Sequence, residues 1–120
     1  MRKTLIILAA VAALGGAAVA QQSMPMMDMM MPKDSDAAST KAYKTSMMKM
    51  MHAMPRDYTG NADIDFMRQM RVHHQGAVDM SEVVLQHGRD DEVKRLARKI
   101  IDDQKKEIAE IDAWLQKNPR

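Results

Sequence analysis

The 120-residue chain contains no cysteine, and only 3% of its residues are aromatic. The absence of cysteine excludes disulfide cross-links and excludes lipid attachment through a processed cysteine. Nucleic-acid binding is disfavoured because it needs clustered Lys and Arg beside stacking side chains. The chain has 18 basic and 16 acidic residues, and removal of a leader that carries Arg2 and Lys3 leaves the two equal. We therefore expect no nucleic-acid partner.

The first twenty residues have the pattern of an export signal. Arg2 and Lys3 precede an apolar run over 5–14, and the sequence Ala18-Val19-Ala20 has the small residues that a signal peptidase recognises. The alternative is a retained membrane anchor, but the stretch 5–20 is shorter than the roughly 20 residues that span a bilayer. We predict that residues 1–20 are a cleaved signal peptide. The mature protein is then periplasmic or secreted, with no membrane anchor.

Residues 21–36 have no helical or strand period and contain two prolines, so they are predicted to be a disordered, Met-rich tail. The remainder, 37–120, is predicted to be a helical bundle domain. The tail methionines have no core to fill, which leaves two functions open: capture of a soft metal, or a sacrificial sink for oxidants. These residues are Met24, Met26, Met27, Met29, Met30 and Met31.

Three longer helices are predicted in the domain. The first covers 39–54, with Ser35 or Ser39 as N-cap, and ends before Pro55. The second covers 62–87, between the N-cap Asn61 and a left-handed Gly88. The third covers about 90–117. Because the connection at 88–90 is short, the last two helices form an antiparallel hairpin in which facing residue numbers total about 178, to within a turn.

The apolar residues of the second helix repeat at helical spacing and define a stripe, which we predict to be the buried face. Its members are Phe66, Met70, His73, Ala77, Met80 and Val84. The Met-rich helix is expected to pack across the open side of the hairpin. The rest of the groove would accept a helix from a second copy of the chain, which makes a homodimer an expected assembly.

Methionine is unusually frequent, with 15 residues, and it occurs with histidine and without cysteine. Neutral, polarisable thioether sulfur selects Cu(I), and by the same softness Ag(I), over Zn, Mg or Ca. Thioether needs no deprotonation and cannot be oxidised to a disulfide, which suits an exported Cu(I) protein. The predicted metal ligands are His73, His74, Met67, Met70 and Met80 on the second helix and Met47, Met48, Met51, His52 and Met54 on the first.

Each of these residue types has a simpler explanation. Methionine at helical spacing often fills irregular gaps in a core, and an inward His73 could be satisfied by a hydrogen bond to Gln104. Glu107, at the edge of the third helix's inner stripe, is instead placed to orient an imidazole that binds metal. For the methionines of the first helix, core packing and metal binding remain equal alternatives.

Several motifs between residues 62 and 116 resemble the domain of unknown function 305 family, which includes CopM-like periplasmic copper- and silver-binding proteins. They are Asp65-Phe66-Met67-Arg68-Gln69-Met70, His73-His74-Gln75-Gly76-Ala77-Val78-Asp79-Met80, Ile100-Ile101, Gln104, Glu107-Ile108 and Trp114-Leu115. The resemblance implies an all-α, ferritin-like helical bundle that binds Cu(I), Cu(II) or Ag(I) through Met67, Met70, His73, His74 and Met80. Arg71-Val72 departs from the hydrophobic residue and proline that many members have there.

The leading functional hypothesis is an exported protein that sequesters copper or silver, or transfers it to a partner protein, without catalysis. One alternative is a Met-rich protein-interaction module with no metal role. Another is a di-iron enzyme, suggested by analogy with ferritin-like folds. Such sites use Glu-x-x-His from two helices, and the residues three positions before His73, His74 and His87 are Met70, Arg71 and Val84.

Overall fold

The computed structural model describes residues 25–119, so the predicted signal peptide lies outside the described residues. The described chain contains four helices and no strand, which confirms the all-α class. The helices are α1 (Pro25–Met30), α2 (Ala38–Ala53), α3 (Ala62–His87) and α4 (Asp91–Lys117).

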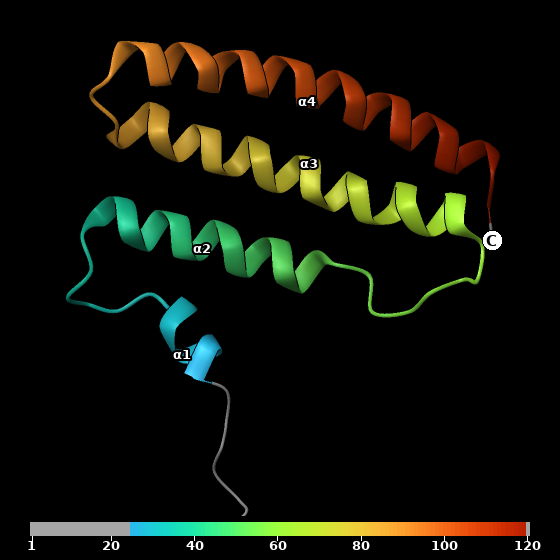
Figure 1. The fold of residues 1–120 in the computed structure, drawn as a ribbon, viewed down its shortest axis with the longest axis horizontal. Coiled ribbons are helices and arrows are strands. Elements are labelled where there is room, and N and C mark those ends of the chain that lie inside the picture. The colour runs from blue at the N-terminus through green and yellow to red at the C-terminus, as the bar shows by residue number, and fades with distance from the viewer. Residues whose placement is uncertain (1–24, 120) are drawn as a thin grey trace, which may run out of the picture.

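The three long helices lie side by side in a single antiparallel layer (Figure 1). Helix α3 is central, with α4 along one flank and α2 along the other, and α1 contacts only α2. α2 and α4 do not pack against each other. The hairpin of α3 and α4 was predicted, but the expected position of the Met-rich helix was wrong, because α2 lies beside α3 and not across the hairpin.

The starts of the two hairpin helices follow from capping side chains. The side-chain oxygen of Asn61 accepts hydrogen bonds from the backbone N–H groups of Asp63 and Ile64, at 3.0 and 3.3 Å. The carboxylate of Asp90 accepts one from the Val93 N–H at 2.9 Å. Each bond satisfies a donor that has no partner within the first helical turn. The predicted bounds of α3 are therefore confirmed, and those of α4 are correct to within a residue.

Other helix ends differ from the prediction. The residue before α2 is Ala37, whose side chain makes no cap, so neither Ser35 nor Ser39 is the N-cap. Gly88 ends α3 with a φ of −72°, outside the left-handed region. It is glycine for a steric reason, because a Cβ there would lie 2.6 Å from the carbonyl oxygen of Val84. Gly60, in the loop before α3, is in the left-handed region with a φ of 82°.

Part of the predicted disordered tail is helical. Residues Pro25–Met30 form α1, a helix of six residues. Proline is well tolerated at a first helical position because its missing N–H would have no partner there, and methionine has good helix propensity. The segment shows no helical period in its sequence because six residues are too few to show one.

The buried apolar residues are few and lie along both flanks of α3. They are Val78 and Val83 on α3 and Ala97 and Ile111 on α4. Two serines are also buried, and each hydroxyl donates to a backbone carbonyl within its own helix, Ser46 to Tyr43 and Ser81 to Ala77. A layer one helix thick buries little surface, so each of these contacts matters to stability.

The stripe that we predicted to be buried is largely open. Phe66 is 60% exposed, Met80 is 42% exposed and His73 is also exposed. The prediction failed because α2 and α4 cover the two sides of α3 and leave the face between them uncovered. The residues turned towards these neighbours are the ones that become buried, including Gly76 and Ser81.

One ion pair and one contact between a histidine and a carboxylate fix the register of the hairpin. Arg71 donates from Nε and Nη2 to the two carboxylate oxygens of Asp112, at 3.0 and 3.3 Å. His74 Nε2 lies 2.5 Å from Glu107 Oε2. The observed register is displaced by about a turn from the predicted one, in which Asp112 lay opposite Phe66 and His74 lay level with Gln104.

The loop before α3 is held by the carboxylate of Asp65. It accepts hydrogen bonds from the backbone N–H and the hydroxyl of Thr59, at 2.8 and 2.9 Å, and from the Gly60 N–H at 3.2 Å. The bond from the Thr59 N–H has the largest effect, and together these bonds lower the pKa of Asp65 below its ordinary value of 3.8.

This loop should make stability pH-dependent in the acid range. A carboxyl group whose pKa is depressed by folding stabilises the folded state above its unfolded pKa, near 3.8, and that stability is lost as the pH falls through the folded pKa. We expect Asp65→Asn to lower the melting temperature at pH 6, with the difference shrinking below pH 3.8. Asp63→Asn, in the same helical turn, is the control. An equal effect of the two variants at every pH would contradict the assigned role of Asp65.

Candidate metal centre

The Met-rich end of α2 packs closely on the middle of α3. A Cβ added to Gly76 would lie 2.5 Å from the sulfur of Met50, so glycine at this position permits the close approach of the two helices. One turn further along α3, Lys49 of α2 forms an ion pair with Asp79 at 2.8 Å. The bond to Asp79 raises the pKa of Lys49. This antiparallel register places Met54 level with His73 and Met47 level with Met80.

We expect Gly76→Ala to destabilise the protein by about 1 kcal/mol. Alanine normally stabilises a helix interior by roughly 0.5–1 kcal/mol relative to glycine, but here the methyl group must displace Met50, at a typical overpacking cost of 1–3 kcal/mol. In a Met50→Ala background, the same change should stabilise the protein. Urea unfolding of wild type, the two single variants and the double variant gives the coupling free energy between positions 76 and 50. A gain in stability from Gly76→Ala alone would contradict the close packing.

The centre itself lies where α3 meets α4. His74 is mostly buried, with 17% of its side chain exposed, and its Nε2 contacts the Glu107 carboxylate from α4. Met70 lies four residues before His74 and Met67 lies seven before it, so the two sulfurs and the imidazole share one side of α3. Both methionines are partly buried. This side of α3 would offer a metal ion two thioethers and one imidazole, a set that suits Cu(I) and Ag(I).

The contact with Glu107 gives the imidazole a defined role. When Nε2 carries the proton, it donates to the carboxylate, and Nδ1 keeps its lone pair for a metal ion. The carboxylate fixes the orientation of the ring. The predicted function of Glu107 as the group that orients an imidazole is consistent with this geometry, and the residue that it contacts is His74.

His73 differs from the prediction. It was expected to point into the core, where a hydrogen bond to Gln104 was the alternative to metal binding. It is instead exposed on the open face of α3, and within residues 25–119 no hydrogen bond joins it to Gln104. The two histidines are one residue apart and so point about 100° apart. The side towards α4 receives His74, and His73 remains on the uncovered side.

The five predicted ligands of α2 divide into two groups. Met47 and Met54 lie on the same side of the helix as Tyr43, which borders the open face. Met48 and His52 lie on the side opposite Ser46, the buried residue that faces α3. Met51 lies between these two groups and is 40% exposed. The structure therefore brings the first group towards α3 and separates Met48 and His52 from the centre.

Met50 was not among the predicted ligands, although its sulfur lies in the interface between α2 and α3. The sequence contained a signal for this contact, because a glycine in the middle of a long helix often marks a close approach of two elements. Gly76 occupies that position, but sequence alone did not identify which methionine packs against it.

In the described part of the chain, no three His, Asp or Glu side chains converge on one point. In the same range, no helix has the length and apolar character needed to cross a membrane.

These observations define an all-α protein with a long helical hairpin that carries clustered Met and His side chains. Residues 63–120 match the family model described as Domain of unknown function (DUF305), so the hairpin is similar to that family. The matched range includes α4 and all but the first residue of α3. It therefore contains the His74–Glu107 contact and the open face. No curated protein matches this chain.

Proposed function

We propose that this protein captures Cu(I), and by the same chemistry Ag(I), outside the cytoplasm, and stores the ion or transfers it to a partner protein without catalysis. The observation that supports the proposal most strongly is the 2.5 Å contact between His74 and Glu107. It fixes an imidazole beside Met70 and Met67 on one side of α3. The proposal is in keeping with the CopM-like proteins that the sequence resembles.

The arrangement of the methionines suits transfer of the ion. Met47 and Met54 border the open face, and Met80 is 42% exposed on it. Thioethers bind Cu(I) without releasing a proton, so an ion can move between neighbouring sulfurs by exchange of ligands at constant pH. Cu(II) would be bound less well, because it prefers nitrogen and oxygen ligands in a tetragonal arrangement.

The location outside the cytoplasm follows from the predicted leader, residues 1–20. Export and cleavage would yield a protein that begins at Gln21. Mass spectrometry of the protein recovered from the periplasm or medium gives its N-terminus. Recovery of the uncleaved chain from the cytoplasm would contradict this part of the proposal.

Anaerobic titration tests the metal assignment. The mature chain competes with a coloured chelator for Cu(I), and a parallel titration uses Zn(II). We expect the protein to remove Cu(I) from the chelator and to leave Zn(II) bound to its own indicator, because two thioethers and one imidazole form a poor zinc site. A chelator that keeps all its Cu(I) would refute the proposal.

A second candidate function is protein binding without a metal role, and the exposure of Phe66 and Leu96, at 60% and 54%, favours it. A binding surface of this kind tolerates His74→Asn, whereas a metal centre does not. Partners that are captured equally well by wild type and His74→Asn, with and without a chelator, would support this alternative.

A further inference from the structure

The open face of α3 is apolar along its whole length. It consists of the stripe Phe66, Met70, His73, Ala77, Met80 and Val84, and it contains no residue that carries a permanent charge. On the α4 side it continues through Val93 and Leu96, which are 46% and 54% exposed. Contiguous exposed apolar surface of this extent usually marks an interaction site. The lack of charge in the stripe favours another apolar surface as the partner.

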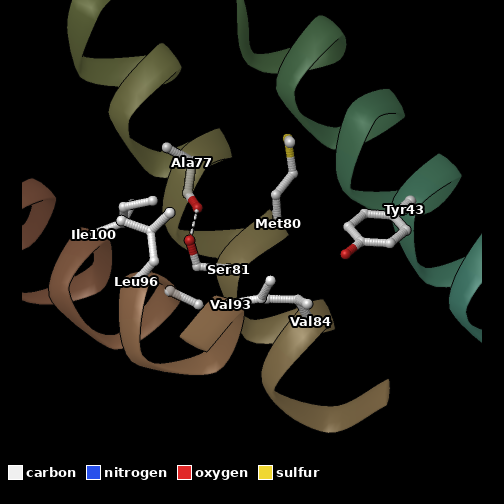
Figure 2. Close-up of a pocket in the computed structure, with 9 residues that line it drawn as sticks. Tyr43, Ala77, Met80, Ser81, Val84, Val93, Leu96 and Ile100 are labelled. Carbon is white, nitrogen blue, oxygen red and sulfur yellow. Dashed lines mark hydrogen bonds between the residues drawn. The ribbon is translucent and has the colours of Figure 1, made fainter. Parts of the chain in front are cut away.

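The stripe has an exposed aromatic side chain near one end and a hollow towards the other. Around Met80 lies a hollow of about 270 Å³, which Tyr43 borders from α2 and Leu96 and Ile100 border from α4 (Figure 2). Further towards the N-terminus of α3 lies Phe66, a large aromatic side chain that is 60% exposed. The projection and the hollow are fourteen residues apart, or about 21 Å along the helix. His73 is midway between them, seven residues from each.

We infer that a second copy of this chain docks on the open face about a two-fold axis that passes by His73. The axis is perpendicular to α3, so the two α3 helices run antiparallel and Phe66 of each copy enters the hollow around Met80 of the other. A two-fold contact requires a self-complementary surface, and a projection and a hollow at equal distances from one point provide it.

The size of the face is sufficient for a specific dimer. From Phe66 to Val84 the stripe is about 27 Å long. The face is two to three helices wide, at helix spacings of about 9 Å, so each copy would bury on the order of 500–700 Å². Specific interfaces bury about 800 Å² on each partner, with about 600 Å² at the lower end of the usual range. We therefore expect a moderate affinity.

The docking also completes a second ligand set, an extension that rests on the proposed function. The axis brings the two His73 imidazoles together, and Met70, which also belongs to the centre around His74, lies one turn before each. In one copy, His73 and Met70 offer one imidazole and one thioether, which is an incomplete site. Two copies together offer two imidazoles and two thioethers, and this set suits Cu(I) or Ag(I).

Sedimentation equilibrium of the mature chain, between about 1 μM and 1 mM, tests the docking. We expect a dimer whose dissociation constant rises at least about 30-fold in Phe66→Glu, as for a central aromatic anchor. Tyr58→Glu is the control, because Tyr58 is 72% exposed but lies in the loop before α3. Circular dichroism verifies that both variants remain helical. A wild-type chain that is monomeric throughout, or equal effects of the two variants, would overturn the inference.

Addition of Ag(I) tests the shared ligand set. At about 100 times its own dissociation constant, an ion bound only between copies tightens the dimer by about 100-fold. We expect this effect in wild type and in the His87→Asn control, and its loss in His73→Asn. A dimer that binds no Ag(I) or Cu(I) would refute the proposed function but not the docking. If Ag(I) binds without tightening the dimer, the ligand set shared between two copies is overturned, but the docking and the proposed function are not.

Discussion

Replacement of Met67 and Met70 by leucine and His74 by asparagine, in one triple variant, is expected to abolish tight Cu(I) binding at the centre between α3 and α4. Leucine is close to methionine in volume, and such exchanges usually cost less than about 1.5 kcal/mol each, so the helices should remain folded. The change removes all three soft donors from one side of α3. Glu107→Ala alone should weaken binding by about 10- to 100-fold, because the carboxylate only orients the imidazole.

A matched control exists on α2. The triple variant of Met48 and Met51 to leucine and His52 to asparagine removes the same residue types from the side of α2 that faces away from α3. Anaerobic competition with a Cu(I) chelator compares the two triples. We expect the α2 variant to keep the tight Cu(I) site. It should lose, at most, equivalents of Cu(I) that are bound with lower affinity. If both variants lose the same share of binding, the ion is bound diffusely by methionines and the centre on α3 is refuted.

Ile111→Ala is expected to have the largest effect on stability, a loss of about 2–4 kcal/mol in the free energy of unfolding. Ile111 is only 7% exposed and is one of four buried apolar residues between 25 and 119. Its removal leaves a cavity between α3 and α4 that neighbouring side chains fill only in part. Because small domains are stabilised by about 5–15 kcal/mol in total, this is a large fraction.

Leu96→Ala is the control for this prediction, since Leu96 lies on the same helix but is 54% exposed. Urea unfolding at protein concentrations below those that favour association should show a loss under about 1 kcal/mol for Leu96→Ala. If the two variants lost equal stability, the contact between α3 and α4 would not be the core of the domain.

The hairpin was predicted well because its signals are local. Asn61 and Asp90 cap their helices through hydrogen bonds to residues two or three positions away, and such patterns can be read from sequence. Gly88 marked the end of α3 correctly, although the reason is steric contact with Val84 and not a left-handed backbone. The start of α2 was less accurate, because Ala37 supplies no side-chain cap.

The exposure of the predicted stripe could not be read from sequence, because it depends on where the third helix lies. An apolar stripe indicates a surface that avoids water, but it does not identify what covers that surface. In the structure, Gly76 draws α2 to the flank of α3 through Met50. Phe66 and His73 consequently remain exposed. The stripe is therefore a candidate interface between copies.

The composition of the candidate centre could be proposed from sequence, but its arrangement could not. Softness of the ligands depends only on residue type, so the Met and His set could be proposed from sequence. The choice between the two histidines depends on a long-range contact, because Glu107 is 33 residues from His74. Similarly, the separation of Met48 and His52 from α3 follows from the rotation of α2, which the buried Ser46 reveals.

The central claim is that Cu(I) is held by methionine sulfur together with a histidine imidazole. X-ray absorption spectroscopy of the mature chain loaded anaerobically with one equivalent of Cu(I) tests it most directly, because the nearest scatterers identify the ligand atoms. We predict sulfur and nitrogen in the first shell, with the imidazole signal lost in His74→Asn. A first shell of nitrogen and oxygen without sulfur, or a spectrum unchanged by His74→Asn, would contradict the account.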